Sequence, residues 1–161
     1  MSESIQTTSL DPKAIILWRL QGLIRLSIVG LPMCLVLAFL LGSYSHFTIG
    51  IAVAGVVFTF GLLKALIWPS FSWQAYGYAM RDTDLLVQSG VLFRRWTSIP
   101  YHRIQHLDTR QGPIERTLGL ARLQVYTASG MSADGSIPGL AQPIAEELRD
   151  VLSQRGGDDG V

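Results

Sequence analysis

The chain has 161 residues, of which only 16% are charged, and its mean hydropathy is +0.32. A single cysteine, Cys34, excludes a disulfide framework. The net charge of +1, without aromatic and basic residues interleaved, argues against nucleic acid as a partner.

The N-terminal residues are polar up to residue 9, and we expect residues 1–10 to be disordered. The next stretch, "LDPKAIILWRLQGLIRL", predicts a helix with Asp11 as N-cap and Pro12 at the first helical position. This helix either lies in the membrane interface or forms the start of the first span. The sequence leaves both alternatives open.

Two apolar stretches follow, Leu26–Tyr44 without a charge and Thr48–Trp68 with one lysine. At about 1.5 Å per residue, each helix would cover about 30 Å, the thickness of a bilayer's hydrocarbon core. Two buried helices of a soluble protein are the alternative, but too little chain remains to surround them. We therefore expect residues 11–69 to form a juxtamembrane helix and a transmembrane hairpin.

Lysine and arginine flank both ends of this hairpin, whereas its short turn carries neither. The positive-inside rule then predicts a multi-pass membrane protein with both termini in the cytoplasm. We expect aromatic and basic residues to anchor the helices at the interface. These predicted anchors are Trp18, Arg25, Tyr44, Lys64, Trp68 and Trp73.

Small residues recur every fourth position on both spans, a pattern that lets helices approach closely. They are Gly30, Cys34, Ala38 and Gly42 on the first span, and Gly50, Ala54, Gly61 and Ala65 on the second. They predict packing within the hairpin or, alternatively, an oligomer interface. Pro32 predicts a kink in the first span.

After Pro69 the apolar periodicity changes to two, which predicts antiparallel strands in residues 70–155. Expected strands are 72–81, 84–90, 91–99, 103–111 and 121–129, with a short segment at 136–140. The stretch "GPIERTLG" predicts a helical turn. "PIAEELRDVLSQR" predicts a closing helix with an apolar stripe of Ile144, Leu148, Val151 and Leu152, which ends at Gly156. Residues 156–161 are expected to form a flexible acidic tail.

The framework "SG.L.R...SIP..RIQH.D...GP.ER..GLA.L...TA" covers Gln88–Gly130 and resembles the bacterial pleckstrin-homology-like (PH-like), membrane-flanked family, whose short form is YdbS-like. The resemblance implies an α+β membrane protein of the bacterial inner membrane. Its N-terminal two-helix transmembrane hairpin precedes a PH-like antiparallel β-barrel or sandwich, capped by a C-terminal helix. It implies seven strands, where the pattern gives five or six, with Met131–Gly139 as the place to look for the missing one. It also implies no catalytic residues, and assembly with a larger membrane protein bearing several such domains.

His102 and His106 have the i, i+4 spacing of a zinc site on a helix. The surrounding pattern predicts a strand, however, on which His106, Asp108 and Arg110 share one face. We expect a structural role, with Arg103 paired to Asp108 or Glu115, and neither cofactor, metal nor catalytic residues. A metal-dependent enzyme using both histidines is the remote alternative. The serines lack a nucleophile motif, and Cys34 lies in a predicted span.

Six arginines lie in the predicted β domain and form a candidate surface for a lipid or a partner protein. They are Arg94, Arg95, Arg103, Arg110, Arg116 and Arg122. We expect a non-enzymatic, membrane-anchored scaffold that assembles with itself or with other membrane proteins. Recognition of anionic phospholipid headgroups by these arginines is the alternative.

Overall fold

The computed structural model describes residues 7–44, 47–128 and 135–158. The chain divides into two compact units, one of residues 18–71 and one that joins residues 1–17 to residues 72–161. The helical hairpin is therefore an insertion in the β domain. The domain boundaries predicted at residues 11 and 70 differ from this division. Residues 1–17 belong to the β domain, so the chain enters that domain before it enters the hairpin.

The first long helix runs without a break through α1 (Lys13–Arg25), a π-helical turn (Leu26–Gly30) and α2 (Leu31–Tyr44). Residues 13–25 and the first span thus form one continuous helix, and a place of this segment in the membrane interface stays a prediction. Leu31 donates its N–H to the Leu26 carbonyl five residues back. This π-helical turn directly precedes Pro32, which lacks a backbone donor, and the kink expected there stays a prediction.

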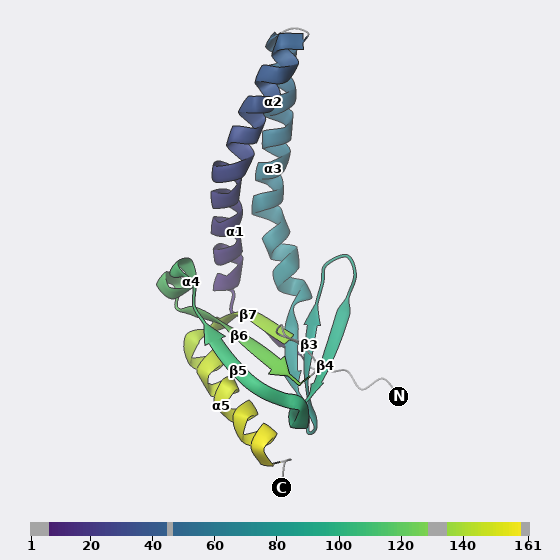
Figure 1. Ribbon diagram of the computed structural model, residues 1–161, viewed down its shortest axis with the longest axis vertical. Helices are drawn as coiled ribbons and strands as arrows, with labels where there is room; N and C mark the ends of the chain where they lie inside the picture. Colours follow the sequence, from purple (N-terminus) through teal and green to yellow (C-terminus); the bar gives the residue numbers. More distant parts are fainter. Residues whose placement is uncertain (1–6, 45–46, 129–134, 159–161) are drawn as a thin grey trace. The chain divides into compact units, whose positions relative to one another are not determined.

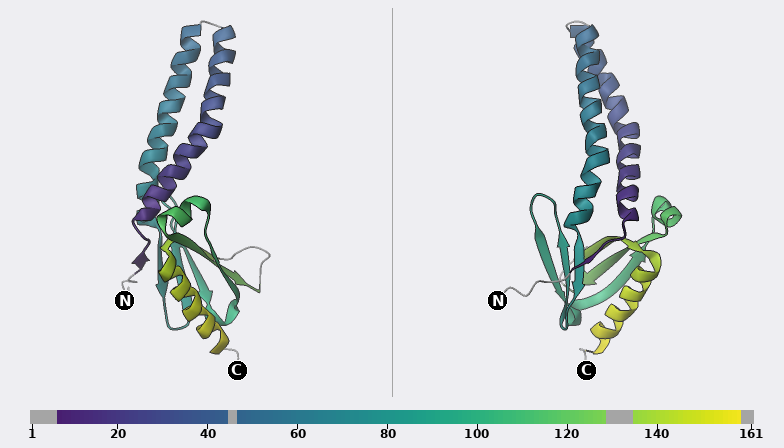
Figure 2. Two further views of the ribbon diagram at one scale, coloured as in Figure 1. Left: turned by 90° about the vertical axis from the view of Figure 1, so that its left-hand side faces the viewer. Right: turned by 180° about the vertical axis from the view of Figure 1, so that it is seen from behind.

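The second long helix, α3 (Phe47–Ala75), runs beside the first (Figure 2). A Cβ added to Gly50 would overlap the Ala38 carbonyl oxygen and lie 2.8 Å from the Gly42 nitrogen. A Cβ added to Gly61 would lie 2.9 Å from Leu26 Cδ1. Since such distances exclude larger side chains, small residues set the close approach inside the hairpin. An oligomer interface on the same residues remains a prediction.

The first sheet has the order β1-β2-β3-β4 and is antiparallel throughout. Its strands are β1 (Thr8–Ser9), β2 (Gly77–Met80), β3 (Asp84–Ser89) and β4 (Arg95–Pro100). Thr8 pairs with Tyr78 across the whole inserted hairpin. The expected disorder of residues 1–10 is therefore wrong for residues 8–10. The strand expected from residue 72 begins only at Gly77, because α3 continues through Pro69 to Ala75.

The second sheet has the order β5-β6-β7 and is also antiparallel. Its strands are β5 (Ile104–Arg110), β6 (Leu120–Thr127) and β7 (Gly135–Ala141). A 3-10 turn (Tyr101–Arg103) precedes β5, and the predicted helical turn is α4 (Pro113–Leu118). The strand sought in Met131–Gly139 is β7, whose described part starts at Gly135. The two sheets form a sandwich and do not close into a barrel.

The closing helix α5 (Gln142–Asp158) lies along β5 (Figure 1). It buries Ala145, Leu148 and Leu152 at 0–4% exposure, against apolar side chains of the sheets. Ile144 is 46% exposed, so its predicted place in the buried stripe is wrong and Ala145 takes it. The helix also continues past Gly156, because two glycines lower helix propensity without forcing an end. Residues 159–161 of the predicted tail lie outside the described residues.

The N-terminal segment belongs to the core of the β domain. Leu10, Ala14 and Leu17 are 0–2% exposed. Asp11 accepts a hydrogen bond from the Lys13 N–H at 2.8 Å, as predicted for an N-cap, and its own N–H donates to the Gly139 carbonyl at 3.1 Å. The domain therefore needs residues on both sides of the inserted hairpin.

Candidate functional site

The six arginines of the candidate surface do not form one patch. Arg94 and Arg95 lie at the turn between β3 and β4 in the first sheet. Arg110 and Arg122 are cross-strand partners in the second sheet. The remaining two lie on short helical turns before β5 and before β6, namely Arg103 and Arg116. The β domain thus has two separate basic surface regions, one on each sheet.

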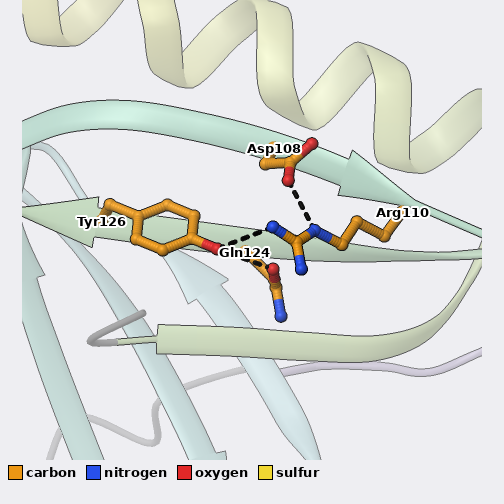
Figure 3. Close-up of polar contacts among 4 residues, drawn as sticks. All are labelled: Asp108, Arg110, Gln124 and Tyr126. Atoms are coloured by element: carbon orange, nitrogen blue, oxygen red, sulfur yellow. Dashed lines mark hydrogen bonds and ion pairs between the residues drawn. The ribbon is translucent and has the colours of Figure 1, made fainter. Parts of the chain in front are cut away.

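The first of these surface regions is the outer side of β5 and β6, shown in Figure 3. Arg110 donates from Nε to Asp108 Oδ2 at 2.6 Å and from a terminal nitrogen to the Tyr126 hydroxyl at 3.3 Å. Tyr126 donates in turn to Gln124 Oε1 at 2.9 Å. The His106 ring lies 5.8 Å from the Tyr126 ring, tilted by 41°. We call these five residues the polar face.

Strand pairing holds the polar face in place. His106 is opposite Tyr126 and Asp108 is opposite Gln124, so residues two apart on each strand point to the same side. The Asp108 carboxylate raises the pKa of Arg110, chiefly by accepting its hydrogen bond. Arginine is protonated at physiological pH in any case, and the hydrogen bonds to Asp108 and Tyr126 orient this cation on the face. The face can bind a partner through hydrogen bonds and ring contacts.

Glu115 is a buried structural carboxylate that the sequence named only as a possible partner of Arg103. Its side chain is 5% exposed, and its two oxygens accept from the Gly112 N–H at 2.6 Å and from Arg122 at 3.1 Å. It closes the first turn of α4 in the manner of a capping residue. The expected pairs of Arg103 are wrong, because Asp108 binds Arg110 and Glu115 binds Arg122. The signal was the Gly-Pro-x-Glu spacing, which marks a helix start.

The two histidines lie on different elements, His102 in the 3-10 turn and His106 on β5, and both are exposed. Within the described ranges, no three His, Cys, Asp or Glu side chains come together in a way that could hold a metal ion. Ser98 donates its hydroxyl to Asp84, a carboxylate on the neighbouring strand. That pair joins β3 to β4 and does not have the serine–histidine geometry of a nucleophile.

The second surface region is the turn between β3 and β4 together with the first two residues of β4, which we call the hairpin tip (residues 90–96). The pattern predicted that a strand runs from residue 91, but β4 begins at Arg95. Leu92, Phe93 and Trp96 are 77%, 88% and 55% exposed, the first two being the most exposed large apolar residues of the described β domain. Periodicity missed this feature because alternating apolar residues look alike in a strand and in an exposed turn.

The predicted interface anchors divide between the two units. Trp18, Arg25, Lys64 and Trp68 lie in residues 18–71, as does Tyr44, whose side chain is not described. Trp73 belongs to the β domain, where its indole N–H donates to the Leu10 carbonyl at 3.0 Å. Arg19, absent from that set, donates to the Leu66 carbonyl at 3.0 Å and to Ser70 Oγ at 3.1 Å. It joins the two helices near Pro69, which lacks a backbone donor.

Both long helices expose their apolar side chains. Lys13–Ser43 and Phe47–Ala75 are long and apolar enough to cross a membrane, and only 6% and 11% of their most apolar windows are buried. Core helices of a soluble protein would be covered instead. The Bacterial PH domain family model matches residues 26–156 of the chain. The chain belongs to the bacterial PH domain family.

Two curated relatives of this bacterial PH-domain protein come from Bacillus subtilis (strain 168). UPF0699 transmembrane protein YdbS is 32% identical over 156 residues, which cover 94% of this chain and 95% of the relative. UPF0699 transmembrane protein YdbT is 24% identical over 107 residues, which cover 66% of this chain and 21% of that longer relative. No solved structure matches the chain. The bacterial PH-domain protein is thus a YdbS-like membrane protein with transmembrane helices.

Proposed function

We propose that this protein is a non-enzymatic scaffold of the bacterial inner membrane, with both termini in the cytoplasm. Its PH-like domain docks through the polar face onto another PH-like domain, from a second copy or from a homologous membrane protein. The observation that carries the proposal is the cluster of Arg110, Tyr126 and His106, which are joined by a hydrogen bond and a ring contact on two paired strands. Arginine and tyrosine are enriched among residues that dominate interface energies.

The membrane tether makes such weak docking effective. Two transmembrane helices confine the domain to the plane of the bilayer, which raises its effective concentration toward partners in the same membrane. A surface of a few hydrogen bonds and ring contacts then suffices. The similarity to part of the longer YdbT supports a homologous domain as the partner, because 66% of this chain matches 21% of that larger transmembrane protein.

Co-purification of two differently tagged copies from native membranes in mild detergent tests the proposal, with detection of any longer homologue as a second readout. Arg110→Ala combined with Tyr126→Ala should lower recovery of the second copy or homologue on the order of tenfold, corresponding to about 1.4 kcal/mol. Arg149→Ala is the matched control, because Arg149 also forms an exposed ion pair, with Asp150 at 2.7 Å. Equal recovery of both variants would refute docking through the polar face.

A separate experiment tests the proposed orientation of the β domain on the cytoplasmic side of the membrane. A cysteine at Ser153 on α5, in a Cys34→Ala background, should react with a membrane-impermeant maleimide only after cells are opened. Labelling of intact cells at that position would place the β domain outside and contradict the proposal.

A further inference from the structure

The hairpin tip combines exposed apolar side chains with a fixed backbone. Gly90 has φ +98°, and a Cβ added there would overlap the Phe93 carbonyl, so the turn requires glycine. The tight turn holds Leu92 and Phe93 outward at 77% and 88% exposure. Trp96 on the adjoining strand is 55% exposed. A soluble surface rarely keeps three large apolar residues together without a binding role.

The charged residues around the hairpin tip are all positive. Arg94 and Arg95 directly follow Phe93 and are both exposed, and no acidic residue occurs between Asp84 and Asp108. Leucine, phenylalanine and tryptophan beside arginine are typical of segments that lie at the boundary between lipid headgroups and acyl chains. The arginines would face the phosphates while the apolar side chains enter the bilayer. This charge complementarity favours anionic lipid as the occupant.

Strand register places the tip near the point where the chain enters the sheet from α3. Gly77, the first residue of β2, follows the end of α3 by two residues, and it pairs with Gln88, which pairs with Trp96. Neighbouring strands lie about 4.8 Å apart, so Trp96 lies about 10 Å across the sheet from Gly77. β3 runs antiparallel to β2, and the tip therefore projects beyond the end at which β2 begins.

We propose that the hairpin tip inserts Leu92 and Phe93 into the interface of an anionic bilayer, with Arg94 and Arg95 bound to lipid phosphates. The chain joins the β domain covalently to the transmembrane helices, so insertion into the same bilayer costs little translational entropy. Insertion would fix the orientation of the β domain relative to the membrane plane. The proposal does not depend on docking through the polar face, which lies on the other sheet.

The test uses the full chain in vesicles of phosphatidylglycerol and phosphatidylcholine. In a Cys34→Ala background, Phe93→Cys carries an environment-sensitive fluorophore, and Thr83→Cys is the control. Thr83 is exposed in the turn between β2 and β3, at the opposite end of β3 from the tip. Spin-labelled lipids should quench the probe at position 93 several-fold more strongly than at position 83. Arg94→Gln with Arg95→Gln should lower insertion about tenfold in anionic vesicles and little in phosphatidylcholine alone.

Equal quenching at positions 83 and 93 would overturn the proposal. So would a probe at position 93 that is shielded in native membranes but is not quenched by lipid in vesicles, because a protein partner would then cover the tip. Trp96 gives an independent readout without labelling. Because Trp18 and Trp68 in the spans are quenched as well, brominated lipid should remove a larger absolute fluorescence intensity from the unmodified chain than from Trp96→Phe, and an equal absolute loss would contradict insertion.

Discussion

The contact between Gly139 on β7 and Ala14 on α1 shows how the N-terminal helix is joined to the β domain. Gly139 has φ +65°, and a Cβ added there would lie 2.5 Å from the Ala14 Cβ, which is fully buried. Carbon atoms in contact prefer about 3.5–4.0 Å, so α1 and β7 would have to separate by about 1 Å. Gly139→Ala should therefore destabilise the domain by two separate effects.

The conformational cost and the packing cost of Gly139→Ala can be separated with a matched control. Alanine in the left-handed conformation costs roughly 1–2 kcal/mol, and overpacking of a closed core costs about 1–3 kcal/mol more. Gly119 has φ +68°, but nothing lies within 4 Å of its added Cβ. Gly119→Ala should therefore show only the conformational cost. The excess loss in Gly139→Ala measures the contact with Ala14.

Thermal unfolding of the full chain in mild detergent, followed by tryptophan fluorescence, measures both variants. At roughly 4–8 °C per kcal/mol for a domain of this size, Gly139→Ala should lower the Tm by about 5–20 °C more than Gly119→Ala. Adding Ala14→Gly to Gly139→Ala should recover most of that excess, although Ala14→Gly alone costs about 1 kcal/mol of helix propensity. Equal losses at the two glycines, or no recovery in the double variant, would refute the reasoning.

Three further predictions concern the same domain. Glu115→Gln should destabilise it by about 1 kcal/mol, because the amide still accepts the backbone hydrogen bond but no longer forms an ion pair with half-exposed Arg122. Glu115→Ala should cost about 2 kcal/mol, because it loses both interactions. Equal losses of the two variants in thermal unfolding would contradict this. Burial raises the pKa of the Tyr101 hydroxyl above its ordinary value of about 10. The native state therefore holds this proton more tightly than the unfolded state, and stability should be constant below about pH 10 and fall above it, more steeply in the unmodified chain than in Tyr101→Phe. Asp11→Ala should cost about 1 kcal/mol by leaving the Lys13 N–H without its cap, and an unchanged Tm would argue against that role.

The sequence by itself determined the two apolar helices, the change to strand periodicity and the closing amphipathic helix. Each depends on local composition and spacing, such as the uncharged stretch Leu26–Tyr44, and a span of that length has few alternatives. The family framework then predicted the PH-like sandwich and the region of its last strand. The N-cap at Asp11 was also readable, since capping depends on residues two or three positions apart.

Only the tertiary structure decided which residues come together from distant parts of the chain. Thr8 pairs with Tyr78 across an inserted hairpin, a contact that local patterns do not encode. The partners of Asp108 and Glu115 depended on strand register and on α4. The exposure of Phe93 depended on where β3 and β4 stop pairing. Periodicity tells which residues alternate, whereas register and turn position determine which side chains meet and which remain in solvent.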